Sequence, residues 1–324
     1  MKFVIAGLGS IGRRHLRNLL ALGEQDIVLY RSHSSNLPDD ELKGFPVETD
    51  LAVALGHHPD AVIISNPTSL HLDVAIPAAE AGCHLLLEKP VSHSLERIDR
   101  LRSAVRSGGG QVLMGFQFRF HPTLRTAARL LAEGALGRPI SAQCHWGEHL
   151  PSWHPWEDYR LSYTARADLG GGVVLTLCHP LDYLCWLLGT PHLAWACVDS
   201  VGDLGIPVDD LAEIGLRFPT GAIASVHLDY LQQPTTHHLE IIGTQGTLRW
   251  NNADGSLALF QPDKAAWQTF LPPEGFERNW LFMDEMRHFL AVARSEAAPV
   301  CGLEDGIRVL DLALQALTAG RRRG

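Results

Sequence analysis

The chain has 324 residues, of which 46% are hydrophobic and 19% charged, a composition typical of a globular protein rather than a disordered one. Lysine and arginine number 27 against 36 aspartates and glutamates, and the net charge of −9 argues against a nucleic-acid-binding protein. At roughly 150 residues per domain, this length predicts two domains. Six cysteines without a CxxC spacing predict reduced thiols and no metal site, and without a signal peptide or membrane span we expect a cytoplasmic protein.

Strands and helices are predicted to alternate over the first 116 residues. Short apolar runs bounded by polar residues or glycine predict buried strands at residues 3–6, 27–30, 61–65, 84–87 and 112–115. Apolar residues at helical spacing predict helices at residues 13–22, 51–55, 70–81 and 95–107. This alternation predicts an α/β fold with a doubly wound parallel sheet, and we place this first domain at residues 1–119.

Residues 120–324 predict a second α/β domain. Its first part reads as a helix at 122–133, a strand at 140–146, an aromatic loop at 149–169 and one helix at 173–188. Strand-like segments separated by turns then predict a large, mostly antiparallel open sheet, with its clearest strands at residues 211–218, 222–231, 238–243, 247–251 and 257–260. Helices at 280–294 and 303–319 close the chain, and the last is expected to be able to pack back on the first domain.

A G-x-G-x-x-G turn directly follows the first predicted strand and opens the first helix. In this context the turn predicts a dinucleotide site, because its glycines permit a tight turn, close approach of a pyrophosphate and close packing of helix on strand. The predicted cofactor contacts of this turn are Gly7, Leu8, Gly9, Ser10, Ile11 and Gly12.

The end of the second predicted strand bears on the choice between NAD and NADP. An acidic residue there would bind the ribose 2′-hydroxyl of NAD, but this sequence has no acid before Asp39. Arg31, with the hydroxyls of Ser32 and Ser34, suits a 2′-phosphate and favours NADP. The alternative is that Arg31 stacks beside the adenine and that both cofactors bind.

Two further patterns suggest acid–base chemistry. Lys89, in the segment Glu88-Lys89-Pro90, follows the fourth predicted strand and so lies at the carboxyl edge of the sheet, where ligands bind. His179 and Asp182 form H-x-x-D in the predicted helix 173–188, so both project from one helical face. His179 is suited to take a proton from a substrate hydroxyl, with Asp182 fixing its tautomer. The alternative is a histidine of the core paired with Asp182.

Five segments occur in the order expected for one family. They are GLGSIG, SNPTSLH at 65–71, LLLEKP at 85–90, GFQFRFHP at 115–122 and LGGGVVLTLCHPLDYLCWLLG at 169–189. Together they resemble the glucose–fructose oxidoreductase, inositol dehydrogenase and rhizopine-catabolism (Gfo/Idh/MocA) family over nearly the whole chain. The resemblance implies an N-terminal Rossmann domain, and a C-terminal domain whose open sheet mediates a homodimer or homotetramer.

The resemblance also implies roles for particular residues. Lys89 matches the catalytic lysine of the family and His179 its catalytic histidine, and Arg119 matches an arginine near the pocket. The implied cofactor contacts in this part of the chain are Asn66, Pro67, Thr68, His71, Glu88 and Lys89. Many members carry an aspartate three or four residues before the catalytic histidine, but Leu175 and Thr176 stand there in this chain. Thr176 can bond a sugar hydroxyl but cannot take a proton.

The aromatic loop is the expected substrate wall, because sugar rings bind against aromatic faces while charged side chains bond their hydroxyls. The full set of predicted substrate contacts is Arg119, Trp156, Arg160, Thr176, His179 and Asp182. The alternative is that this loop lies at the rim and packs against a neighbouring subunit. The long sheet could also supply a subunit interface, with Val226, Leu228 and Tyr230 as its candidate residues. Adjacent His237 and His238 point to opposite faces of a strand and do not predict a shared metal ion.

These observations predict an NAD(P)-dependent oxidoreductase, with NADP favoured, that transfers hydride between nicotinamide and a carbon of a sugar or sugar derivative. Two alternatives stay open. One is a glycoside hydrolase that oxidises its substrate transiently with a retained NAD. The other is a non-catalytic regulator that binds a dinucleotide and a protein partner, against which the presence of both Lys89 and His179 argues. Fold alone does not decide among them.

Overall fold

The computed structural model describes residues 1–32, 38–155 and 157–320, so the contacts predicted for Ser34 and Trp156 lie outside the described residues. The chain divides into two compact units. Unit 1 comprises Met1–Gln117 and Arg278–Ile307, and unit 2 comprises Phe118–Glu277 and the chain from Arg308 onward. Unit 1 thus includes the helix that starts at Arg278 and also residues 303–307, the beginning of the last helix.

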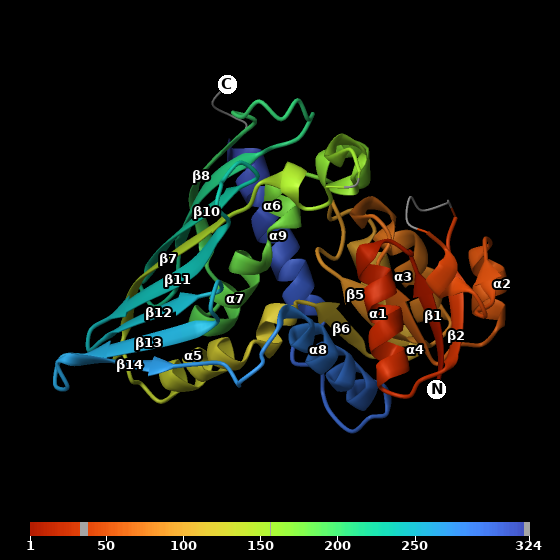
Figure 1. Ribbon diagram of the computed structural model, residues 1–324, viewed down its shortest axis with the longest axis horizontal. Helices are drawn as coiled ribbons and strands as arrows, with labels where there is room; N and C mark the ends of the chain where they lie inside the picture. The colour runs from red at the N-terminus through yellow and green to blue at the C-terminus, as the bar shows by residue number, and fades with distance from the viewer. Residues whose placement is uncertain (33–37, 156, 321–324) are drawn as a thin grey trace. The chain divides into compact units, whose positions relative to one another are not determined.

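Unit 1 contains a six-stranded parallel sheet in the order β3-β2-β1-β4-β5-β6. Its strands are β1 Lys2–Ala6, β2 Asp26–Tyr30, β3 Val47–Glu48, β4 Ala61–Ile64, β5 His84–Glu88 and β6 Val112–Gly115. Its helices are α1 Ser10–Ala21, α2 Leu51–Gly56, α3 His71–Glu80, α4 Ile98–Gly108 and α8 Arg278–Ala293 (Figure 1). Apart from Val47 of the edge strand β3, the large apolar residues of these strands are buried on both faces of the sheet, as in doubly wound folds. The predicted parallel sheet is confirmed, with the short edge strand β3 in addition.

Unit 2 is built on an eight-stranded sheet in the order β14-β13-β12-β11-β7-β10-β9-β8. Its strands are β7 Pro139–Gly147, β8 His192–Asp199, β9 Leu211–Arg217, β10 Ile223–Asp229, β11 Thr236–Gly243, β12 Thr247–Asn251, β13 Ser256–Gln261 and β14 Ala266–Phe270. Its helices are α5 Pro122–Ala132, α6 Val173–Thr176, α7 His179–Leu188 and most of α9 Leu303–Gly320. β7 and β10 pair in parallel, and the other pairs are antiparallel, so the predicted mostly antiparallel sheet is confirmed.

The two faces of the eight-stranded sheet differ. Helices α5, α6 and α7 contact one face, the inner face, onto which the strands project alternate buried side chains (Figure 1). Val226, Leu228 and Tyr230 are all fully buried on β10 or just after it. Our suggestion that they supply a subunit interface is therefore wrong, because an interface needs exposed side chains.

The predicted single helix over residues 173–188 is also wrong, because it is two helices. Helix α6 ends at Thr176, and α7 begins at His179 with Pro180 in its first turn. Proline has no N–H to donate, and its ring collides with the carbonyl four residues earlier, which here belongs to Thr176. The break therefore places His179 at the first position of α7 and Thr176 on the preceding helix.

Within the described residues, no single helix is both long and apolar enough to cross a membrane. The bent pair Ala167–Thr176 and His179–Leu188 meets the length and composition test when its two parts are taken together. The expected aromatic loop, residues 149–169, contains short 3₁₀ turns at Leu150–Ser152, Tyr159–Leu161, Tyr163–Ala165 and Ala167–Leu169.

Candidate cofactor and catalytic site

The glycine turn between β1 and α1 leaves room only where a ligand would approach. Gly7 has a φ of +91°, and a Cβ on it would overlap the backbone of Asn66. A Cβ on Gly12 would overlap the carbonyl oxygen of Gly7, so this glycine allows the helix to pack closely on the turn. Gly9, in contrast, has nothing within 4 Å of its Cβ position. The space beside Gly9 is where a pyrophosphate can approach the backbone.

Helix α1 presents its first N–H groups at this turn. No side chain of the described residues caps the helix, whose N-cap is Gly9, and its first turn carries no acidic residue. The buried Arg13 instead points back and donates from Nε to the Leu8 carbonyl at 2.9 Å, which fixes the turn. A helix N-terminus that no described side chain caps, and whose first turn carries no acidic residue, suits an anion such as a diphosphate. The described residues of the glycine turn and of the first turn of α1 therefore fit the diphosphate of a dinucleotide at the carboxyl end of β1.

The end of β2 holds an ion pair that the sequence spacing does not reveal. Arg31 donates to both carboxylate oxygens of Asp39, from Nη1 at 2.9 Å and from Nη2 at 2.7 Å. Arg13 Nη2 also reaches Asp39, at 3.3 Å. The hydrogen bond from Arg31 lowers the pKa of Asp39. The fold thus brings an ionised acid next to Arg31, although the two residues are eight positions apart.

The loop after β4 is held to the neighbouring turns by polar side chains. Ser65 Oγ lies 3.1 Å from the Ala6 carbonyl oxygen and 3.0 Å from that of Gly7. The buried His71 places Nδ1 2.9 Å from the Pro90 oxygen and Nε2 3.0 Å from the Asn66 oxygen. Burial lowers the pKa of His71, which favours the neutral ring. His71 therefore connects the loop after β4 to the loop after β5, which positions both loops.

Pro67 and Thr68 lie in the same loop, where Thr68 begins a 3₁₀ turn and is buried. Asn66 donates from Nδ2 to the Leu70 carbonyl at 3.0 Å, so its side chain closes this turn. The loop is thus ordered by its own hydrogen bonds, at the carboxyl edge of the sheet where the cofactor contacts were predicted.

Glu88, at the end of β5, is part of a buried cluster that the sequence analysis did not predict. Its Oε1 accepts a hydrogen bond from His15 Nε2 at 2.8 Å, and its Oε2 lies 3.3 Å from the backbone N of Lys89. Burial works against its ionisation, but the hydrogen bond and charge of His15, with Lys89 nearby, leave the pKa of Glu88 below its usual value. Glu285 of α8 completes the cluster. Residues 15, 88 and 285 share no motif, so no spacing could have revealed it.

His179 sits in an aromatic cluster of unit 2. It is 2% exposed, with its ring centroid 5.1 Å from that of Phe118 and 5.6 Å from that of Trp146. Asp182, one turn further along α7, accepts two hydrogen bonds from Arg119 Nε, at 3.1 and 3.0 Å, and one from Nη2 at 2.7 Å. Arg119 and Asp182 thus form a buried ion pair, which assigns Asp182 a structural partner that the H-x-x-D pattern did not indicate.

The other predicted substrate contacts lie in different surroundings. Arg160 is exposed, pairs with Asp158 at 3.4 Å and lies over the ring of Tyr159. Thr176 is buried at the end of α6. Lys89 belongs to unit 1 and His179 to unit 2.

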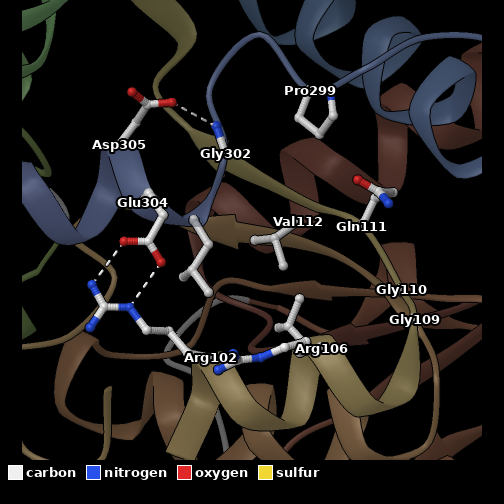
Figure 2. Close-up of a pocket in the computed structure, with 12 residues that line it drawn as sticks. Arg102, Arg106, Gly109, Gly110, Gln111, Val112, Pro299, Gly302, Glu304 and Asp305 are labelled. Carbon is white, nitrogen blue, oxygen red and sulfur yellow. Dashed lines mark hydrogen bonds and ion pairs between the residues drawn. The ribbon is translucent and has the colours of Figure 1, made fainter. Parts of the chain in front are cut away.

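A pocket in unit 1 lies away from these residues (Figure 2). It is lined by the segment from Gly109 to Val112, which leads into β6, and by the start of α9. Figure 2 shows Glu304 paired with Arg102, and Asp305 accepting from the backbone N of Gly302 at 2.9 Å. Because it surrounds the amino end of a parallel strand, this pocket is at the edge opposite the glycine turn and is not the predicted cofactor site.

Two family descriptions match this chain. Residues 1–116 match the oxidoreductase family with an NAD-binding Rossmann fold, and residues 124–249 match the GFO/IDH/MocA C-terminal domain. The protein is thus an NAD(P)-binding Rossmann-fold oxidoreductase by class, and the chain belongs to the Gfo/Idh/MocA family.

Several known proteins are similar to this chain. D-xylose 1-dehydrogenase (NADP(+)) 2 of Haloferax volcanii is 26% identical over 96% of this chain and 94% of its own. The 1,5-anhydro-D-fructose reductase of Ensifer adhaerens is 32% identical over 60% of this chain and 57% of its own. Levoglucosan dehydrogenase in complex with NADH and levoglucosan is 21% identical and shares the fold, with a TM-score of 0.85 over 100% of this chain and 98% of that one.

Proposed function

We propose that this protein is an NADP-preferring dehydrogenase or reductase that acts on a CH–OH group of a sugar or sugar derivative. The observation that carries the proposal is the glycine turn before α1, a helix whose N-terminus no described side chain caps. Lys89 lies at the same edge of the sheet, directly after β5. Membership of an oxidoreductase family supports it, and so do relatives named as a D-xylose dehydrogenase and an anhydrofructose reductase. A homodimer or homotetramer stays a prediction from the family resemblance.

The roles of the residues follow from their chemistry. Bound NADP supplies the nicotinamide carbon that accepts or donates hydride. In the oxidative direction, His179 accepts the proton of the substrate hydroxyl. Lys89 donates a hydrogen bond to the reacting oxygen and stabilises negative charge that develops on it. Asn66, Pro67 and Thr68, in the loop that His71 holds, would contact the nicotinamide ribose of the bound cofactor.

The preference for NADP rests on the end of β2. Arg31 offers a planar pair of donors that already binds a carboxylate with both nitrogens, and a 2′-phosphate presents similar oxygens. NADP binding would replace the Arg31–Asp39 contact with an Arg31–phosphate contact, while Arg13 stays as a partner for Asp39. Asp39 is also the acid that would bind a 2′-hydroxyl, so Arg31 and Asp39 favour opposite cofactors from the same place.

A titration of the purified protein with NADPH and with NADH, followed by nicotinamide fluorescence, tests this preference. We expect NADPH to bind at least about tenfold more tightly, a difference of about 1.4 kcal/mol. Arg31→Gln should abolish the difference by weakening NADPH alone, and Asp39→Asn should increase it by removing a competing carboxylate. Arg97→Gln, which removes a comparable exposed Arg–Asp pair at Asp73, is the matched control. Tighter binding of NADH, unaffected by Arg31→Gln, would contradict the preference.

The catalytic assignment needs a separate measurement. In a screen of aldoses, ketoses and sugar lactones, Lys89→Ala and His179→Ala should each lower turnover by about 100-fold or more while cofactor affinity changes little. Lys43→Ala removes an exposed lysine and is the control for Lys89. If these variants lose cofactor binding equally, the two residues are structural. If denatured protein instead releases a tightly held nicotinamide nucleotide, the hydrolase with transient oxidation replaces the proposal.

A further inference from the structure

Three histidines form a row on the outer face of the eight-stranded sheet, the face opposite α5, α6 and α7. His145 on β7 is in register with His227 on β10 and with His238 on β11. All three are partly exposed, while the next residue of each strand is buried on the inner face. The rings stack, with centroids 4.2 Å apart for His145 and His227 and 5.4 Å apart for His145 and His238. The row belongs to unit 2 alone and is unrelated to the proposed function.

Two of these histidines converge with a carboxylate at the end of β7. One ligand-type atom from each of His145, His227 and Asp229 lies within 4.8 Å of the other two. His227 Nε2 is 2.9 Å from Asp229 Oδ2, and His145 Nε2 is 2.5 Å from the side-chain oxygen of Gln232. Four potential ligand atoms, two imidazole nitrogens and two oxygens, are therefore directed into one small volume.

Gly147 and the backbone shape this volume. A Cβ on Gly147 would overlap both Asp229 Oδ2 and the side-chain oxygen of Gln232, so only glycine leaves the space between these atoms open. Asp229 is 3% exposed, and its Oδ1 accepts from the backbone N–H groups of Leu231 and Gln232 at 2.7 and 2.6 Å. These two hydrogen bonds orient the carboxylate so that Oδ2 faces the histidines.

Glu213 on β9 supports His227 from the far side. Its Oε1 accepts from His227 Nδ1 at 2.6 Å, which leaves Nε2 directed at Asp229. A carboxylate on the second nitrogen of an imidazole is the arrangement that fixes the tautomer and orientation of metal-binding histidines. We propose that His145, His227 and Asp229 bind a divalent transition-metal ion, with Gln232 beside the fourth coordination position and Glu213 as the orienting carboxylate.

The ligand set indicates the type of ion. Two imidazole nitrogens with one carboxylate suit Zn²⁺, Co²⁺ or Ni²⁺, whereas Mg²⁺ and Ca²⁺ prefer oxygen ligands only. Two ligand atoms that each lie about 2.1 Å from one zinc ion are roughly 3.0 to 3.4 Å apart. The His227–Asp229 separation of 2.9 Å is already close to this. The nitrogen of the half-exposed His145 lies within 4.8 Å of both, so a rotation of its ring would bring it nearer to them. Two protons compete with the ion: the one shared by His227 and Asp229, and the one that His145 Nε2 donates to the side-chain oxygen of Gln232.

Metal binding by the untagged, chelator-treated protein tests the proposal. In equilibrium dialysis against micromolar ZnCl₂ at pH 8, we expect about one zinc ion per chain, and Co²⁺ should give a visible absorption band of a nitrogen- and oxygen-ligated site. His145→Gln and His227→Gln should each weaken zinc binding by about tenfold or more, and Glu213→Gln by about 10- to 100-fold. His238→Gln, on the same face but outside the converging atoms, is the matched control and should bind zinc as the unchanged protein does.

Three results would overturn the proposal: no bound zinc, zinc binding that survives in both His145→Gln and His227→Gln, or an equal loss in His238→Gln. Both histidines are half-exposed, so their variants are expected to fold, whereas a variant of the buried Asp229 serves only as an addition. NADPH affinity, which depends on unit 1, should be unchanged in all of them. A variant that loses both zinc and NADPH is misfolded, and the other histidine variant then decides.

Discussion

Two clusters of histidine and carboxylate side chains, one in each unit, combine the same residue types in different surroundings. In unit 1, both carboxylate oxygens of Glu285 lack a hydrogen-bond partner among the described residues. Burial, with the adjacent charge of Glu88, raises the pKa of Glu285 well above its usual value. In unit 2, Asp229 is 3% exposed, and although burial works against its ionisation, hydrogen bonds from His227 and two backbone N–H groups leave its pKa below the usual value.

The difference shows that burial alone does not decide whether an acid keeps its charge. What decides it is the number of donors that the fold directs at the carboxylate. Asp229 has three donors and holds a negative charge, which together with Glu213 raises the pKa of His227 to about 8. Glu285 has none among the described residues and is expected to be protonated. Three substitutions test this conclusion, in order of decreasing effect.

The largest effect is expected where a buried charge loses the carboxylate paired with it. Asp182→Ala leaves the guanidinium of Arg119 buried without the carboxylate that binds it, which should cost about 3 to 5 kcal/mol of unfolding free energy. Asp158→Ala breaks the exposed pair with Arg160 and should cost less than about 1 kcal/mol. Urea unfolding of both variants measures the difference. Similar costs for the two would show that burial does not amplify the loss of a partner.

Lowering the pH should reduce the stability of the protein at a buried histidine, which is the opposite of its effect at a buried carboxyl group with a raised pKa. His121 is 1% exposed, and burial lowers its pKa to about 4. Thr123 gives its hydroxyl proton to the Gly255 carbonyl at 2.7 Å, so the neutral ring donates from Nδ1 to Thr123. Between pH 6.5 and 4 the unfolded chain binds a proton at this position that the folded chain does not. Stability is therefore complete above pH 6.5 and falls by about 3 kcal/mol as the pH drops to 4.

The matched variant for this prediction is His121→Phe, which keeps a ring in the same aromatic environment but does not titrate. Carboxylates elsewhere also reduce stability in acid, so the informative quantity is the difference between the two proteins. The unfolding free energy of the variant should decline less between pH 7 and pH 4.5. Parallel pH profiles would show that His121 is protonated in the folded protein.

Much of the fold was predictable because it depends on local patterns. The parallel strands of unit 1 were found as short apolar runs, and the glycine turn followed from its position between a strand and a helix. The error over residues 173–188 was also local, since Pro180 was present to mark the break. The short edge strand β3 was missed because two residues carry too little periodicity to detect.

The site was less predictable because its contacts join distant parts of the chain. Lys89 and His71 could be placed at the carboxyl edge from strand order alone. The pairing of Arg31 with Asp39, and of Arg119 with Asp182, could not be predicted, since no motif connects these positions. His227 and Asp229 form an H-x-D on one strand face, which was a usable signal, but the contribution of His145 required the strand register.

The smallest effect is expected for the acid that has lost its charge. Glu285→Gln replaces a protonated carboxyl with a neutral group of nearly the same shape, so the two proteins should be similarly stable near pH 5. Because the folded-state pKa of Glu285 is raised, the native protein holds a proton that the unfolded chain releases above its ordinary value of 4.5, and stability falls as the pH rises. The glutamine variant avoids this loss and should be the more stable of the two at pH 8.5. Glu277→Gln, at an exposed glutamate, should show no such gain. If Glu285→Gln is less stable at every pH, then the carboxylate of Glu285 is ionised in the folded protein and accepts stabilising hydrogen bonds, as that of Asp229 does.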